Sequence, residues 1–317
     1  MRLDRLIVGL VIFVSMCGSA FAQHYFRIGT GGTGGTYYPI GVQIASLVSQ
    51  PGKVVVSAQP SAGSLGNVIG VATGSLESGF SQADIATWAQ TGTGTFEGKP
   101  PLTRLRLIAN LFSESIHIVV RKDSAIQRVS ELRGKRVALD EVGSGSLISA
   151  RMVLAAHGLK EADLKPEYIK PNQSADRLLA GNLDAFFFTG GVPAKAIADL
   201  AAGATGIRLL PIEGEAARRL RSESPFLFED TVAAGAYSGV PATPTLAVGA
   251  QWVTDERADA ELVYQITRAL YAESAQKALA SGHPKGASIT LANAVRGAGI
   301  PFHEGARRFY REAGVVK

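Results

Sequence analysis

Residues 25–41 read YFRIGTGGTGGTYYPIG and hold the signals from which the rest of the fold is predicted. The aromatic and β-branched residues over 25–28 predict a strand. Pro39, in the first turn of the apolar segment that follows, predicts a helix beginning at Tyr37. The glycines and threonines between them predict a loop at the carboxyl end of the strand. Open α/β sheets bind their ligands at this end, so the stretch predicts an α/β unit with a binding loop.

The same order of strand, glycine with serine or threonine, and helix recurs three more times. The later loops are Ser61-Ala62-Gly63-Ser64, Gly143-Ser144-Gly145-Ser146 and Thr189-Gly190-Gly191. The first amides of a helix lack intrahelical partners and carry partial positive charge, and glycine admits a ligand closely. We therefore expect the four helix starts to hold a carboxylate or phosphate without a lysine. The alternative is ordinary helix capping, for which serine and threonine are also favoured.

Short β-branched runs alternate with amphipathic helical patterns along the chain of 317 residues. This alternation favours α/β lobes with mostly parallel sheets. The segments predicted here include strands over Leu105–Ala109, Ile116–Arg121 and Thr245–Trp252, and a single helix over Asp255–Ala280.

The chain is predicted to cross between two lobes twice. A polar stretch follows residue 121, and two prolines lie between residues 240 and 245. We expect residues 23–121 and 241–317 to form lobe I and residues 122–240 to form lobe II. A hinge crossed at least twice, beside a cleft, is a common geometry for ligand binding.

Residues 1–22 have the pattern of a cleaved secretory signal. Arg2 and Arg5 precede an apolar run from Leu6 to Cys17, and Ala20-Phe21-Ala22 fits the cleavage pattern of small residues. We expect export to the periplasm, with an uncleaved membrane anchor as the alternative. Cleavage would remove the single cysteine of the chain, and with it any disulfide or thiol chemistry.

The composition excludes several classes of protein. Hydrophobic residues are 46% and charged residues 19% of the chain, which disfavours disorder. The net charge of +5 comes from dispersed lysines and arginines without a run of five, so we expect no nucleic acid partner.

Nucleotide binding and catalysis are both poorly supported. Gly29, Gly31 and Gly34 have the spacing of a dinucleotide-binding loop, but Gly52 and Lys53 stand where an acidic ribose partner is needed. A secreted hydrolase is the enzymatic alternative, yet Gly143-Ser144-Gly145-Ser146 is not a nucleophile elbow. The spacing of histidine, cysteine and acidic residues suggests no metal site. We expect a protein that is not an enzyme and needs neither cofactor nor metal.

Three buried-looking polar residues have alternative interpretations. Gln82 and Asp84 follow an apolar stretch, where the carboxylate could bind a ligand amine or cap the helix over 85–91. His117 lies in an apolar strand and is interpreted as a hydrogen-bonded core or hinge residue.

At least two of the three phenylalanines at 186–188 are expected in the core.

The residues from Gly29 to Gly41 resemble the opening of TAXI-family solute receptors, the substrate-binding proteins of tripartite ATP-independent periplasmic (TRAP) transporters. Further matching pieces follow in family order: Ser64-x-x-Asn67, Gln82-x-Asp84, Leu132-x-Gly134-Lys135-Arg136-Val137, Gly143-Ser144-Gly145-Ser146 and Asp184-Ala185-Phe186-Phe187-Phe188-Thr189-Gly190-Gly191-x-Pro193. One departure is the stretch Gly235-Ala236-Tyr237-Ser238-Gly239, where a proline-led turn is expected.

This resemblance implies a two-lobe periplasmic binding protein of type II-like architecture that delivers its ligand to integral membrane permease subunits. It implies a small organic anion as ligand, such as a dicarboxylate, a 2-oxo acid or glutamate. The residues implied to approach this ligand are Gly34, Thr36, Tyr37, Ser64, Gln82, Ser144, Ser146, Thr189 and Gly190. The alternative in the same class is a receptor for an ABC-type importer, which differs in its membrane partner.

Overall fold

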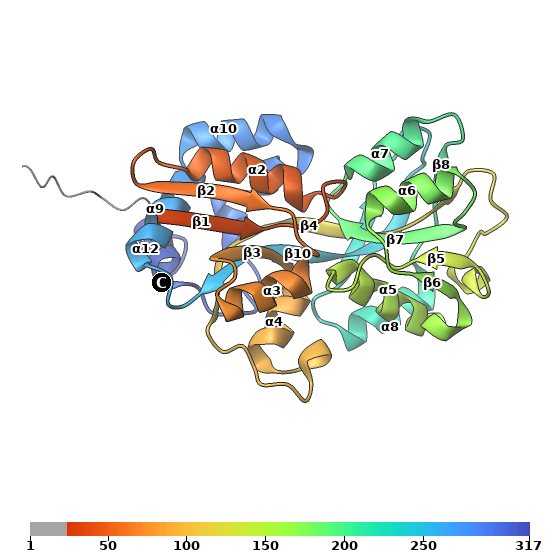
Figure 1. Cartoon of the computed structure of the whole chain (residues 1–317), viewed down its shortest axis with the longest axis horizontal. Helices are drawn as coiled ribbons and strands as arrows, with labels where there is room; N and C mark the ends of the chain where they lie inside the picture. Colours follow the sequence, from red (N-terminus) through yellow and green to blue (C-terminus); the bar gives the residue numbers. More distant parts are fainter. Residues whose placement is uncertain (1–23) are drawn as a thin grey trace, which may run out of the picture.

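The computed structural model describes residues 24–317 (Figure 1). Its strands are β1 (His24–Gly29), β2 (Val54–Gln59), β3 (Ser78–Gln82), β4 (Leu105–Arg121), β5 (Arg136–Ala138), β6 (Lys165–Glu167), β7 (Ala185–Gly190), β8 (Ile207–Leu209), β9 (Phe228–Val232) and β10 (Thr243–Asp255). Its α-helices are α2 (Tyr37–Val48), α3 (Ser64–Thr73), α4 (Ala83–Thr91), α5 (Gly145–Ala156), α6 (Pro171–Leu179), α7 (Lys195–Ala202), α8 (Gly214–Glu223), α9 (Ala260–Leu270), α10 (Glu273–Gly282), α11 (Leu291–Ala294) and α12 (Glu304–Glu312). The predicted signal, residues 1–22, lies outside the described residues.

One sheet runs through both lobes, with the strand order β2-β1-β3-β10-β4-β7-β5-β6. Strand β1 pairs in parallel with β2 and β3 in lobe I, and β5 pairs in parallel with β6 and β7 in lobe II. The long strands β4 and β10 lie side by side and antiparallel, and extend from one lobe into the other (Figure 1). The predicted parallel pairing is therefore found within each lobe, whereas β10 with β3 and β4 with β7 pair antiparallel. A chain that leaves and re-enters lobe I on neighbouring strands must run in opposite directions along them.

Strand β4 is continuous from Leu105 to Arg121, although the sequence predicted two separate strands. The polar residues Ser113-Glu114-Ser115, between the two predicted strands, lie where β4 passes between the lobes. Strand β10 pairs with β3 over Ala250–Thr254 and with β9 over Thr243–Ala247. Its pairing with β4 shifts register between Gly249 and Gln251. The pairing thus changes lobe near Ser115 and Gly249. The boundaries at 121/122 and 240/241 lie closer to the lobe II ends of these strands and remain a prediction.

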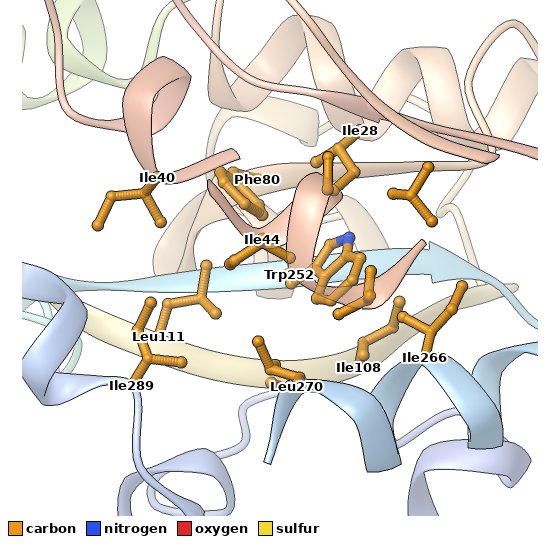
Figure 2. Packing of buried hydrophobic residues seen from close by; sticks show 14 of the residues in the cluster. Ile28, Ile40, Ile44, Phe80, Ile108, Leu111, Trp252, Ile266, Leu270 and Ile289 are labelled. Carbon is orange, nitrogen blue, oxygen red and sulfur yellow. The ribbon is translucent and has the colours of Figure 1, made fainter. Parts of the chain in front are cut away.

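The core of lobe I surrounds Trp252 on β10, which is fully buried. The rings of Phe26 and Phe80 meet the Trp252 ring edge-on, with centroids 6.3 and 6.2 Å away. Ile44 of α2 and Ile266 of α9 pack on the same face of the sheet (Figure 2). Helices α3 and α4 cover the opposite face (Figure 1). These two layers fix the starts of α2 and α3 at the edge that faces lobe II.

The three phenylalanines of β7 are all buried, so the prediction of at least two core residues is confirmed. Their side chains alternate between the faces of the strand, as the period of two requires. Phe187 packs with α5 and α8, whereas Phe186 and Phe188 pack with α6 and α7.

The single helix predicted over Asp255–Ala280 is wrong, because α9 ends at Leu270 and α10 begins at Glu273. Ala272 is extended, and this bend lets Leu270 and Leu279 both reach the core of lobe I. Among residues 24–317, no helix combines the length and apolar character needed to cross a membrane.

Candidate ligand-binding cleft

A cleft lies between the lobes, at the carboxyl ends of β1, β3 and β7. Eight of the nine residues that the sequence singled out line it: Thr36, Tyr37, Ser64, Gln82, Ser144, Ser146, Thr189 and Gly190. Gly34 is not among the lining residues. Its main-chain oxygen instead accepts a hydrogen bond from the Ala196 N–H, at 3.0 Å across the lobes. The structure therefore brings together the loops from both lobes, and contact of these residues with a ligand remains a prediction.

The two lobes are closed on each other. The Gly66 N–H donates to the Gly143 oxygen at 3.0 Å, and the Thr36 hydroxyl donates to the Gly191 oxygen at 2.7 Å. Gly145 lies so close to lobe I that a Cβ atom there would be 2.3 Å from Gln82 Oε1. The centre of a water molecule can occupy only about 50 Å³ of the cleft. The closed cleft therefore has little free space for a solute.

Most serine hydroxyls in the cleft already have partners within the protein. Ser144 caps α5 by accepting from the Leu147 N–H at 3.1 Å, as the capping alternative predicted. Ser64 accepts from the Gln82 N–H at 3.1 Å, and Ser146 accepts from the Thr189 N–H at 3.0 Å. These hydroxyls join the loops to one another. The Ser64 and Ser144 hydroxyls each keep a proton that they can donate to a ligand. The first amides of α2 and α5, which have no intrahelical acceptor, are further donors.

Carboxyl groups that the sequence analysis missed also line the cleft. Glu114 comes from β4, and Asp140 and Glu141 follow β5. The Tyr37 hydroxyl donates to Glu114 Oε2 at 2.6 Å. Burial raises the pKa of Glu114 to about 8 and that of Asp140 to about 7, because the charged forms lose their hydration. The available signal was a single acid between two apolar segments, at Glu114.

The lining residues include no lysine, arginine or histidine within the described part of the chain. The nearby Lys285 donates from Nζ to Ser113 Oγ at 2.8 Å. Its positive charge offsets only part of the rise in the pKa of Glu114 that burial causes. Gln82 Oε1 is buried without a hydrogen-bond partner in the described structure. The cleft thus holds one acceptor without a donor, at Gln82, together with the carboxyl groups of Glu114 and Asp140.

Asp84 performs neither of its two predicted roles. The N-cap of α4 is Gln82, and Asp84 lies in the first turn, where its carboxylate accepts from the Ile85 N–H at 2.7 Å. It is fully buried behind the cleft, outside the set of lining residues, and burial raises its pKa to about 6. Because α4 begins at Ala83, Asp84 lies inside the helix, in a first turn whose residues are buried. The sequence predicted a helix that begins two residues later, at Ile85.

His117 is a buried, hydrogen-bonded residue of β4, as predicted. Burial lowers its pKa to about 4, so the ring is neutral at neutral pH. Over residues 24–317, histidine, cysteine, aspartate and glutamate form no group of three or more suited to a metal ion.

The crossing strands, the two cores and the interlobe cleft define a two-lobe α/β binding-protein fold. The chain belongs to the NMT1-like family, whose sequence model matches residues 28–314. A solved protein from Bordetella bronchiseptica RB50 is similar in fold, with a TM-score of 0.55 at 17% identity, over 91% of this chain and 82% of that one.

Two alkanesulfonate-binding proteins are more distant in structure. The SsuA of Xanthomonas axonopodis pv. citri, bound to MOPS, has a TM-score of 0.48 at 19% identity, over 93% of this chain and 85% of its own. The periplasmic aliphatic sulphonate binding protein SsuA of Escherichia coli has a TM-score of 0.45 at 17% identity, over 91% and 83%.

Proposed function

We propose that this chain is an extracytoplasmic receptor that captures a small organic acid between its lobes and delivers it to the membrane subunits of a TRAP transporter. The NMT1-like family, the two-lobe fold and the closed cleft support the receptor role. The resemblance of residues 29–41 to TAXI receptors supports the TRAP partner. The protein acts by binding alone and returns its solute chemically unchanged.

Among organic acids, the cleft favours an amino acid such as glutamate over a dicarboxylate or a 2-oxo acid. The observation that carries this preference is the group of acceptors formed by Glu114, Asp140 and Gln82 Oε1, without a lining cation among the described residues. A ligand ammonium would pair with these acceptors, and a ligand carboxylate would meet the first amides of α2 and α5. A dicarboxylate would leave Gln82 Oε1 unpaired, at a cost of about 1–3 kcal/mol, and would accept hydrogen bonds from Glu114 and Asp140 only where these are protonated.

A thermal-shift panel on the purified protein tests this proposal. The panel holds L-glutamate, L-glutamine, succinate, 2-oxoglutarate, sugars and nucleotides. A ligand at 100 times its Kd adds about 2.7 kcal/mol to the stability, which raises the Tm by several degrees. We expect a rise with the amino acids. A rise with succinate and 2-oxoglutarate alone would refute the amino-acid preference, and a rise with sugars or nucleotides alone would refute the receptor for organic acids.

The pH dependence of binding separates the two kinds of acid. A ligand ammonium is best held by an ionised Glu114. The pKa of Glu114 is about 8 in the protein without solute, so the affinity for L-glutamate should increase as the pH rises from 6 toward 8. The affinity for succinate should decrease over the same range, because each ionisation adds a negative charge to the cleft. Titration calorimetry at pH 6, 7 and 8 measures both trends.

Export is the second part of the proposal. We expect the mature protein in the periplasm, with the chain cut after Ala22. Cell fractionation and N-terminal sequencing check this, and a mature chain that begins at Met1 would contradict cleavage.

A further inference from the structure

The turn between β7 and α7, residues Gly190–Ala194, is a major point of contact between the lobes, and we call it the closing turn. The Thr36 hydroxyl donates to the Gly191 oxygen at 2.7 Å. His283 Nδ1 accepts from the Lys285 N–H at 3.0 Å, so Nε2 carries the proton and donates to the Pro193 oxygen at 3.2 Å. Both donors belong to lobe I, and separation of the lobes must break both bonds.

A second set of hydrogen bonds holds the closing turn from behind, within lobe II. The Tyr237 hydroxyl accepts from the Ala194 N–H at 3.0 Å and donates to His117 Nε2, which lies 3.1 Å away. His117 Nδ1 then donates to the Phe188 oxygen at 3.3 Å. Every donor in this series meets an acceptor when the imidazole is neutral. The series joins Phe188, just before the closing turn, to Ala194 at its end.

Tyr237 and His117 are each only 1% exposed, and neither side chain lines the cleft. Tyr237 comes from the loop between β9 and β10, within the glycine-containing stretch Gly235–Gly239 that departs from the TAXI-like pattern. Its ring packs edge-on against the His117 ring, with centroids 5.7 Å apart, and belongs to the same core as Phe188. The loop thus contributes a buried side chain that is hydrogen-bonded to the closing turn from within lobe II.

We infer that Tyr237, acting through His117, is a positioning residue that holds the closing turn in the conformation that lobe I can bind. The inference rests on the proposed function, because it assumes a cleft that opens and closes on a solute. Removal of the Tyr237 hydroxyl would leave the Ala194 N–H and His117 Nε2 buried without partners, which is costly. The turn would relax, and the bonds from Thr36 and His283 would lose their geometry. Closure would weaken although no ligand contact had changed.

The test compares two buried tyrosines that each lose one hydroxyl. Tyr237→Phe removes the hydroxyl that joins Ala194 to His117. Tyr310→Phe is the matched control, because the Tyr310 hydroxyl donates to the Ile108 oxygen at 2.8 Å inside lobe I. The reporters are the amides of Ala196 and Gly66, which donate across the lobes to the Gly34 and Gly143 oxygens. Amide hydrogen exchange, followed by NMR without any solute, measures how often each bond opens.

We expect Tyr237→Phe to speed exchange at both Ala196 and Gly66 by about tenfold, a ratio equivalent to about 1.4 kcal/mol. Tyr310→Phe should leave both rates unchanged, even if it lowers the Tm by as much. Gly66 lies on the other side of the cleft from the closing turn, so its response reports opening of the lobes. Faster exchange at Ala196 alone would mean local fraying of the turn and would overturn the inference, as would equal rates in the two variants.

A second variant and a solute arm complete the design. His117→Gln should reproduce the faster exchange if the series of hydrogen bonds acts as a unit, and normal exchange would contradict the role of His117. With L-glutamate as the probe, Tyr237→Phe should raise the Kd about tenfold, mainly through faster dissociation. If the wild-type protein binds none of the acids, the proposed function fails, yet the exchange rates without solute still decide whether Tyr237 controls closure.

Discussion

The helix starts and the acidic residues of the cleft differ in what they leave for a solute. At the helix starts, the hydroxyls of Ser64, Ser144 and Ser146 are engaged with main-chain N–H groups of the protein. Gln82 instead brings an acceptor without a donor, and Glu114 a buried carboxyl group whose pKa is raised by the loss of its hydration. The glycine and serine loops therefore build and close the cleft. The side chains of Glu114 and Gln82 select the charge pattern of the solute.

The largest effect should follow replacement of the acidic group. Glu114→Gln keeps the shape of the side chain, and its amide oxygen can still accept from Tyr37, but the charge is lost. Hydrogen bonds to charged groups contribute about 1.5–3 kcal/mol, so the Kd for L-glutamate should rise roughly tenfold to a hundredfold. Titration calorimetry measures the change.

The matched control is Glu273→Gln, at an exposed carboxylate of α10 outside the cleft, whose Oε1 lies 2.6 Å from Lys277 Nζ. It should change the Kd no more than about threefold, because exposed ion pairs contribute little. An unchanged Kd in Glu114→Gln would show that Glu114 does not select the charge of the solute. Tighter binding of succinate by the same variant would give further support to this selective role.

The two kinds of lining also differ in how far they could be predicted. The loops follow strands and precede helices in a pattern that local sequence carries, so eight of the nine predicted residues line the cleft. Glu114 was missed because it lies within a strand that the sequence divided in two, and only the pairing of β4 with β7 and β10 brings it to the cleft. Gly34 was misplaced because closure of the lobes directs its oxygen toward α7. Both errors concern contacts between distant segments.

A smaller effect should follow removal of two hydroxyls from the building side. In the double variant Thr36→Ala with Ser146→Ala, closure loses the bond to the Gly191 oxygen, and lobe II loses the bond between Ser146 and the Thr189 N–H. The Kd for L-glutamate should rise at least about tenfold, or about 1.4 kcal/mol. Thr254→Ala is the control, because Thr254 is equally buried and donates to the Glu77 oxygen inside lobe I. Unchanged affinity in the double variant would refute this placement of the site.

The last effect is on the stability of the protein without solute. The pKa of Glu114 is about 8 in the folded chain and about 4.5 when exposed, so the folded state holds the proton more tightly between these values. The free energy of unfolding therefore loses this contribution as the pH rises from about 5 to 8. Glu114→Gln has no such proton to lose. The Tm of the variant minus that of the wild type should become more positive by a few degrees across this range in differential scanning calorimetry. A difference that stays constant with pH would refute the raised pKa of Glu114 in the closed cleft.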